Sequence, residues 1–166
     1  MKNKKVKRIV LYTLLVLVLT TIFIFSGEPG KKSESTSDAF TSTIIDKVSS
    51  ITNKDIKETK KKDIIESTRF IVRKTAHFSI YFILGIIIYL LLCTYSINKV
   101  VLISIIICFI FGGLDEIHQI FIPGRTARFY DCIIDTLGSS TSILILYGSS
   151  KIRLRYKNNK VQKIKC

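Results

Sequence analysis

Residues 112–139 read GGLDEIHQIFIPGRTARFYDCIIDTLGS, and they place many charged side chains between two apolar segments. The stretch holds four acidic residues, one histidine and two arginines. It overlaps the run Val100 to Leu114, which is nearly unbroken in its apolar character and holds only one serine and one cysteine. Because such runs predict helices that cross a membrane, the placement of these charges depends on the topology of the whole chain.

The composition is that of a membrane protein. The chain of 166 residues is 48% hydrophobic, its mean hydropathy is +0.35, and its apolar residues are clustered. A helix needs roughly 20 apolar residues to cross the hydrocarbon. We therefore predict an all-α integral membrane protein with one domain over residues 1–166, a long outer loop at 27–75 and a tail at 151–166. Its bundle of four transmembrane helices is expected at about Ile9 to Ser26, Ala76 to Tyr95, Val100 to Gln119 and Cys132 to Gly148.

The first apolar run has an alternative interpretation as a signal peptide. The basic segment Met1 to Arg8 precedes it, and the small residues Ser26 and Gly27 follow it. However, the run is longer than the roughly 7 to 15 residues of a typical signal-peptide core, and Phe25 is a poor residue near a cleavage site. A retained anchor helix is therefore favoured.

The net charge of +14 follows from this topology and requires no nucleic-acid partner. With four spans, the N-terminal segment, Lys99 and the C-terminal tail lie on one side. That side carries 13 of the 26 basic residues and none of the 12 acidic ones. Basic segments favour the cytoplasmic side. We therefore expect a multi-pass protein of the cell membrane, with both termini in the cytoplasm and the loop at 27–75 outside.

The outer loop divides into a polar connector, Gly27 to Ser37, and two amphipathic stretches. In Ala39 to Ile51 the apolar residues recur at helical spacing, so this helix should lie flat on the outer leaflet or against the bundle. A lysine-rich hinge, Lys54 to Lys62, should follow it. The stretch Asp63 to Thr75 should then run continuously into the second span.

Three of the spans bring ionisable residues to the outer leaflet at similar depth. The fifteen apolar residues that end at Leu114 reach only about 22 Å of the roughly 30 Å of hydrocarbon, so the charges that follow must lie below the surface. Because charges that face lipid are costly, they should face inward and pair. The residues at this depth are His77, Asp115, Glu116, His118, Asp131 and Asp135.

Helical spacing predicts pairs among these residues, because positions three or four apart lie on one face. Small residues should in addition allow the helices to pack closely. An interhelical salt-bridge cluster without any ligand is the alternative to a functional site. The expected pairs are Arg73 with His77, Asp115 with His118 and Gln119, and Asp131 with Asp135, and the expected packing positions are Gly85, Gly112, Gly113 and Gly138.

The segments RKTAHFSIYFILG, DEIHQIFIPGR and FYDCIIDTLG resemble the VanZ-like family of bacterial integral membrane proteins. The resemblance covers Ser26 to about Gly138. Its most specific part is the pattern DExHQ-x-F, followed by an arginine and then by D-x-x-x-D-x-x-G. The segment FSGEPG after the first span is a looser form of the family's serine-rich turn. The resemblance implies a protein of the bacterial cell membrane, in a family named for a protein linked to resistance against the glycopeptide teicoplanin. A role in such resistance or in envelope homeostasis is therefore an expectation.

The resemblance also implies which polar positions matter. One departure is Ile80, where relatives often have a glutamate, and it weakens any scheme that needs an acid on the second span. The matching positions are Arg73, Lys74, His77, Tyr81, Asp115, Glu116, His118, Gln119, Arg125, Asp131, Asp135 and Gly138.

The favoured function is a binding site for an anionic group at the outer leaflet. Membrane lipids are the expected partners, together with a lipid-linked cell-wall precursor or a glycopeptide. Arginine binds phosphate through two parallel hydrogen bonds, and the turn at Pro123 and Gly124 should direct Arg125 back to the cluster. The expected binding residues are Arg73, Lys74, Tyr81, Gln119, Arg125, Arg128 and Asp131.

The alternative is a membrane-embedded hydrolase or transferase that acts on a phospholipid or an isoprenoid phosphate. His77 and His118 would serve as nucleophile and general acid, oriented by Asp115, Glu116 or Asp135. No cofactor is expected, but one variant makes the two histidines and two carboxylates a divalent-metal site. Transport is disfavoured, because no charged residue lies in the inner halves of the spans.

Overall fold

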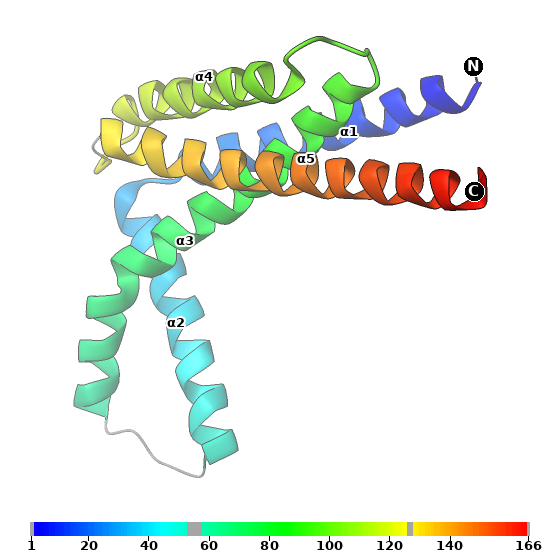
Figure 1. The fold of residues 1–166 in the computed structure, drawn as a ribbon. Coiled ribbons are helices and arrows are strands. Elements are labelled where there is room, and N and C mark those ends of the chain that lie inside the picture. Colours follow the sequence, from blue (N-terminus) through cyan, green and yellow to red (C-terminus); the bar gives the residue numbers. More distant parts are fainter. Residues whose placement is uncertain (1, 53–57, 126–127, 166) are drawn as a thin grey trace.

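The computed structural model of the protein describes all residues except 1, 53–57, 126–127 and 166. The described residues form five helices and no strands, and the structure is 90% helical. The all-α prediction is therefore confirmed. In chain order the helices are α1 (Lys2–Ser26), α2 (Gly30–Thr52), α3 (Glu58–Cys93), α4 (Val100–Ile120) and α5 (Phe129–Lys165) (Figure 1).

Four of these helices are long and apolar enough to cross a membrane. Each contains one of the predicted spans, except that the second span ends at Cys93 and not at Tyr95. The chain leaves α3 there through a short turn, in which Ser96 and Lys99 adopt positive φ angles of 53° and 57°. The apolar segments of the four helices are Asn3–Ser26, Lys60–Cys93, Val100–Ile120 and Phe129–Arg153.

The two termini lie at the same end of the helix bundle, and the connection between α4 and α5 lies at the opposite end (Figure 1). An even number of spans requires this arrangement, since each crossing reverses the direction of the chain. The charged stretch at 112–139 therefore lies at the end of the bundle that is remote from both basic termini.

The centre of the bundle is the packing of α3 against α5, with α4 and α1 beside it. The buried cluster includes Tyr81 and Leu84 from α3, Cys108 from α4 and Ile143 from α5. Large apolar side chains also cover the outer surface of the helices, and Val16 of α1 is 62% exposed. Such exposed apolar surface suits contact with lipid tails.

The loop between the first two spans is a helical hairpin that extends crosswise to α1, α4 and α5 (Figure 1). Arg69 of α3 holds Asp38 of α2 with two hydrogen bonds of 2.8 and 2.7 Å. Lys61 bonds Asp46 at 2.6 Å near the tip. The stretch at 39–51 thus pairs with the N-terminal half of α3, while its place on the leaflet stays a prediction.

Two details of the loop differ from the prediction. The polar connector is only three residues long, because α2 already begins at Gly30. The lysine-rich hinge falls partly on residues 53–57, outside the described residues, and the rest of it is helical, because α3 begins at Glu58. As expected, Asp63 to Thr75 runs without a break into the second span.

Candidate functional site

The site forms where α3 and α5 cross closely. A Cβ atom added to Gly138 of α5 would lie 3.2 Å from the Cα atom of Phe78, and one added to Gly85 of α3 would lie 2.8 Å from an α5 Cα atom. Small residues allow this approach of two backbones. The crossing places His77, next to Phe78, opposite Asp135, which lies one turn before Gly138.

The two neighbouring glycines of α4 differ in their surroundings. Gly112 faces α5, where an added Cβ atom would lie 3.4 Å from the Sγ atom of Cys132. An added Cβ at Gly113 would meet no atom of the described residues within 4 Å. The prediction that Gly113 is a close-packing position is therefore wrong, because only one of two neighbouring residues on a helix faces a given partner.

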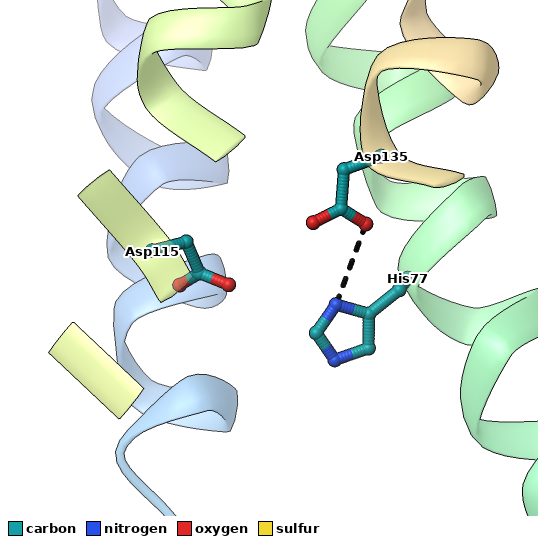
Figure 2. Close-up of side chains that lie close together, drawn as sticks. All are labelled: His77, Asp115 and Asp135. Carbon is teal, nitrogen blue, oxygen red and sulfur yellow. Dashed lines mark ion pairs between the residues drawn. The ribbon is translucent and has the colours of Figure 1, made fainter. Parts of the chain in front are cut away.

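His77, Asp115 and Asp135 point towards one another from α3, α4 and α5 (Figure 2). The Nδ1 atom of His77 lies 3.5 Å from Oδ1 of Asp135, and one ligand-type atom of each residue lies within 4.8 Å of the other two. Asp135 is 0% exposed and Asp115 is 6% exposed. Among the described residues, neither carboxylate oxygen of Asp135 has a hydrogen-bond partner. Such burial of a carboxylate is costly unless a cation or a proton compensates it.

Gln119 connects this cluster to the loop after α4. Its Nε2 donates to Oδ2 of Asp115 over 2.9 Å, and its Oε1 accepts from Nη1 of Arg125 over 3.4 Å. Gln119 is itself buried. The predicted pair of Asp115 with Gln119 is therefore confirmed, and the orientation of the Asp115 carboxylate is linked to Arg125.

Arg125 connects the loop between α4 and α5 to the segment at the C-terminal end of α1. Its Nε donates to the carbonyl of Glu28 over 3.0 Å, and its Nη2 donates to the carbonyl of Phe25 over 2.9 Å. Gly124 supplies the turn that precedes it, with a φ angle of +74°. Burial lowers the pKa of Arg125, and the positive charge of Arg73 lowers it further. An anion that binds between the two guanidinium groups would relieve this repulsion.

Two other acids of the cluster have partners of their own. Lys74 of α3 forms an ion pair with Asp131 of α5. Oε2 of Glu116 accepts a hydrogen bond of 2.8 Å from the backbone N–H of Arg128, immediately before α5 begins. The side chain of Arg128 is exposed. Arg128 therefore takes part in the site through its backbone.

His118 lies apart from the other histidine. Its ring stacks on Phe23 of α1, with ring centroids 4.3 Å apart, and its buried Nδ1 atom has no hydrogen-bond partner in the described part of the chain. The expected pair of Asp115 with His118, and a metal set containing both histidines, are therefore not formed. The reason is that α4 turns His118 towards α1, while Asp115 faces α3 and α5.

A cavity of about 620 Å³ lies beside the cluster, between α1, α2 and α3. His77, Tyr81 and Arg125 line it together with Arg73. Tyr81 is completely buried, and its hydroxyl donates to the carbonyl of Phe111 over 3.4 Å. Arg73 is half-buried and makes no hydrogen bond or ion pair within the described residues, so the expected pair of Arg73 with His77 is not formed. Much of the remaining wall is apolar, with side chains such as Ile22, Phe40, Ile71, Ile80 and Ile83.

Sequence reasoning missed the part of the site that α1 and α2 contribute. Glu28, Ser33 and Ser37 line the cavity, and the carbonyls of Phe25 and Glu28 hold Arg125. The segment FSGEPG was the available signal, since its carbonyls and turn residues follow directly after the first span.

Comparison with known proteins identifies one family. The VanZ/LLP1 family matches residues 9–152, which run from within the first apolar helix to one residue before the end of the fourth and include every residue of the site. No curated protein and no solved structure matches the chain.

Proposed function

Since this chain belongs to the VanZ/LLP1 family and is a multi-pass membrane protein by its helices, we propose that it binds an anionic lipid. The phosphate of the headgroup lies between Arg73 and Arg125, and the hydrocarbon chain occupies the apolar part of the cavity. The lipid is a phospholipid or a lipid-linked cell-wall precursor, two sources of the same phosphate chemistry.

The observation that carries the proposal is the guanidinium of Arg73, which has no hydrogen-bond or ion-pair partner within the described residues. It lies at the wall of a cavity that Arg125 also lines. Two cations near each other at the edge of hydrocarbon favour the binding of an anion, and arginine suits phosphate geometrically. Glu28, which also lines the cavity, already forms an ion pair of 3.2 Å with Lys32.

The volume of the cavity also fits a lipid. Cavities of roughly 300 to 1,000 Å³ enclose ligands of drug size, so 620 Å³ accommodates a headgroup and the first part of one chain. Ile80 and Ile83 line the cavity two and three turns after Arg73, at a rise of about 1.5 Å per residue. A lipid can therefore place its phosphate at Arg73 and its chain along α3.

The basic termini favour a location of this site in the outer leaflet of a bacterial cell membrane, with both termini in the cytoplasm. A link to teicoplanin susceptibility also stays a prediction. It would follow if the bound lipid is a cell-wall precursor.

The proposal predicts that Arg73→Ala weakens lipid binding at least tenfold, as expected for loss of one charge-assisted contact of about 1.5–3 kcal/mol. Binding is measured by native mass spectrometry of the purified protein with phosphatidylglycerol and with an isoprenoid diphosphate, and a neutral diacylglycerol serves as the negative probe. Lys62→Ala is the control, since Lys62 is an exposed cation on the same helix and does not line the cavity. Equal lipid affinity in wild type and Arg73→Ala would refute the proposal.

A hydrolase is the second candidate, and the position of His77 favours it. His77 lines the cavity, and its Nδ1 atom faces Asp135, as in a nucleophile or general base oriented by a carboxylate. The lipid experiment separates the two functions, because turnover of the bound lipid that is lost in His77→Ala would indicate catalysis. Retention of intact lipid would indicate binding alone.

A further inference from the structure

The cluster at the centre of the site combines one imidazole and two carboxylates from three different helices. His77, Asp115 and Asp135 converge on one point between α3, α4 and α5 (Figure 2). Atoms of the three residues that can bind a metal lie within 4.8 Å of one another. In a tetrahedral zinc site with zinc–ligand distances of about 2.0–2.2 Å, two ligand atoms lie roughly 3.3–3.6 Å apart, so side-chain rotations that bring the three atoms about 1 to 1.5 Å closer would place them on one ion.

The charges of this cluster are not balanced by protein cations. Asp135 is 0% exposed and neither of its oxygens has a hydrogen-bond partner among the described residues. Two of the nearby cations have other partners, because Lys74 pairs with Asp131 and Arg125 donates to carbonyls and to Gln119. Arg73 lines the cavity beside His77 but forms no ion pair with an acid within the described residues. A protonated His77 would compensate only one of the two carboxylates. Because buried charges are normally paired or bind a metal, a bound cation would compensate the charge of these two carboxylates.

From these observations we propose that His77, Asp115 and Asp135 bind one divalent cation of the zinc or manganese type. Imidazole nitrogen suits zinc, and carboxylate oxygen suits both zinc and manganese. Three protein ligands leave at least one position open for water or for an anionic group. Since His77 also lines the lipid cavity, the open position is accessible from there.

The surroundings of the cluster resemble the outer shell of a metal site. Gln119 donates to one oxygen of Asp115 over 2.9 Å and so fixes the direction of the carboxylate. Hydrogen bonds of this kind orient the ligands of metal ions. The proposed site does not rest on lipid binding, because Arg73 contributes nothing to it.

The test is metal content of the full-length protein, purified in detergent without chelator and then exposed to zinc or manganese as separate arms. We expect about one equivalent of one of the two metals per chain, removed by a chelator and restored by addition of the metal. Asp135→Asn and Asp115→Asn should each lower the affinity more than a hundredfold. Asp131→Asn is the matched control, since Asp131 lies one turn away on α5 and pairs with Lys74.

Three outcomes would overturn the proposal. The first is a wild-type protein that binds neither metal at 100 micromolar, a result that does not depend on the folding of any variant. The second is a folded Asp135→Asn variant with wild-type affinity for the metal. The third is equal loss in Asp131→Asn and Asp135→Asn, which would indicate a general effect of charge. Metal binding that persists in Arg73→Ala would show that failure of the lipid proposal leaves the metal site intact.

Discussion

At the scale of single residues, the site depends on which face of a helix each polar side chain occupies. Asp115 and Gln119 share a face of α4 and form a hydrogen bond of 2.9 Å, whereas His118 turns to α1 and stacks on Phe23. Arg73 and Lys74 are neighbours in sequence, but only Arg73 lines the cavity, and Lys74 pairs with Asp131. Small differences in helical phase therefore separate residues that a motif groups together.

Substitution of Gln119 tests whether its hydrogen bond to Asp115 orients that carboxylate for metal binding. Gln119→Leu keeps the volume of the side chain approximately but removes the hydrogen bond to Asp115. We expect a loss of metal affinity of about 10- to 100-fold, the usual effect of removing a group that orients a ligand. Titration of the purified variant with zinc and manganese measures it.

The control is Ile120→Ala on the same helix, since Ile120 is 62% exposed and lies outside the site. Wild-type affinity in Gln119→Leu would indicate that Asp115 is held in place by other contacts.

At the scale of helices, the close crossing of α3 and α5 determines the geometry of the site. Gly138 and Gly85 both lie so near to the opposite helix that an added methyl group would overlap it. The crossing holds His77 and Asp135 at a distance of 3.5 Å between Nδ1 and Oδ1. The packing of these glycines and the chemistry of the cluster are therefore coupled.

We expect Gly138→Ala to separate α3 from α5 and to destabilise the protein by about 1–3 kcal/mol, the usual cost of overpacking. Metal and lipid binding should weaken with it. Gly113→Ala is the matched control on a membrane-spanning helix, because an added Cβ atom there meets none of the residues that the structure describes within 4 Å. Alanine also has the higher helix propensity, so the control should be neutral or slightly stabilising. Thermal unfolding of both variants in the same detergent measures the difference, and equal melting temperatures would contradict the role of Gly138.

At the scale of the whole molecule, the topology decides which leaflet the site faces. The termini lie at one end of the bundle and the loop between α4 and α5 at the other (Figure 1). The basic end favours the cytoplasm, so the cluster and the α2–α3 hairpin should face outward.

Cysteine labelling of intact cells tests this orientation. In a variant without native cysteines, Ser35→Cys on α2 should react with a membrane-impermeant thiol reagent in intact cells. Lys5→Cys should react only after permeabilisation. Both positions are exposed in the folded protein, so burial does not limit either reaction. The reverse pattern would place the site in the inner leaflet.

Much of the fold is predictable from the sequence because membrane insertion depends mainly on local hydrophobicity. Each of the four apolar runs is long enough to cross the hydrocarbon. A segment in the hydrocarbon must satisfy its own backbone hydrogen bonds, as a helix does, and the structure has a helix at each run. The extent of α2 was harder to predict. Its first turns are rich in polar residues, and their helical form is stabilised by contacts with α3 such as that of Asp38 with Arg69.

The four membrane helices follow from the pattern of apolar residues, as does the gathering of acids, arginines and histidines near one end of them. Which of these residues meet depends on how the helices pack. His77 joins Asp115 and Asp135, His118 does not, and Arg125 is held by carbonyls at the end of α1. The physical reason is that hydrophobic runs report the depth of a residue in the membrane, whereas the rotation and crossing of helices depend on side-chain packing between distant segments.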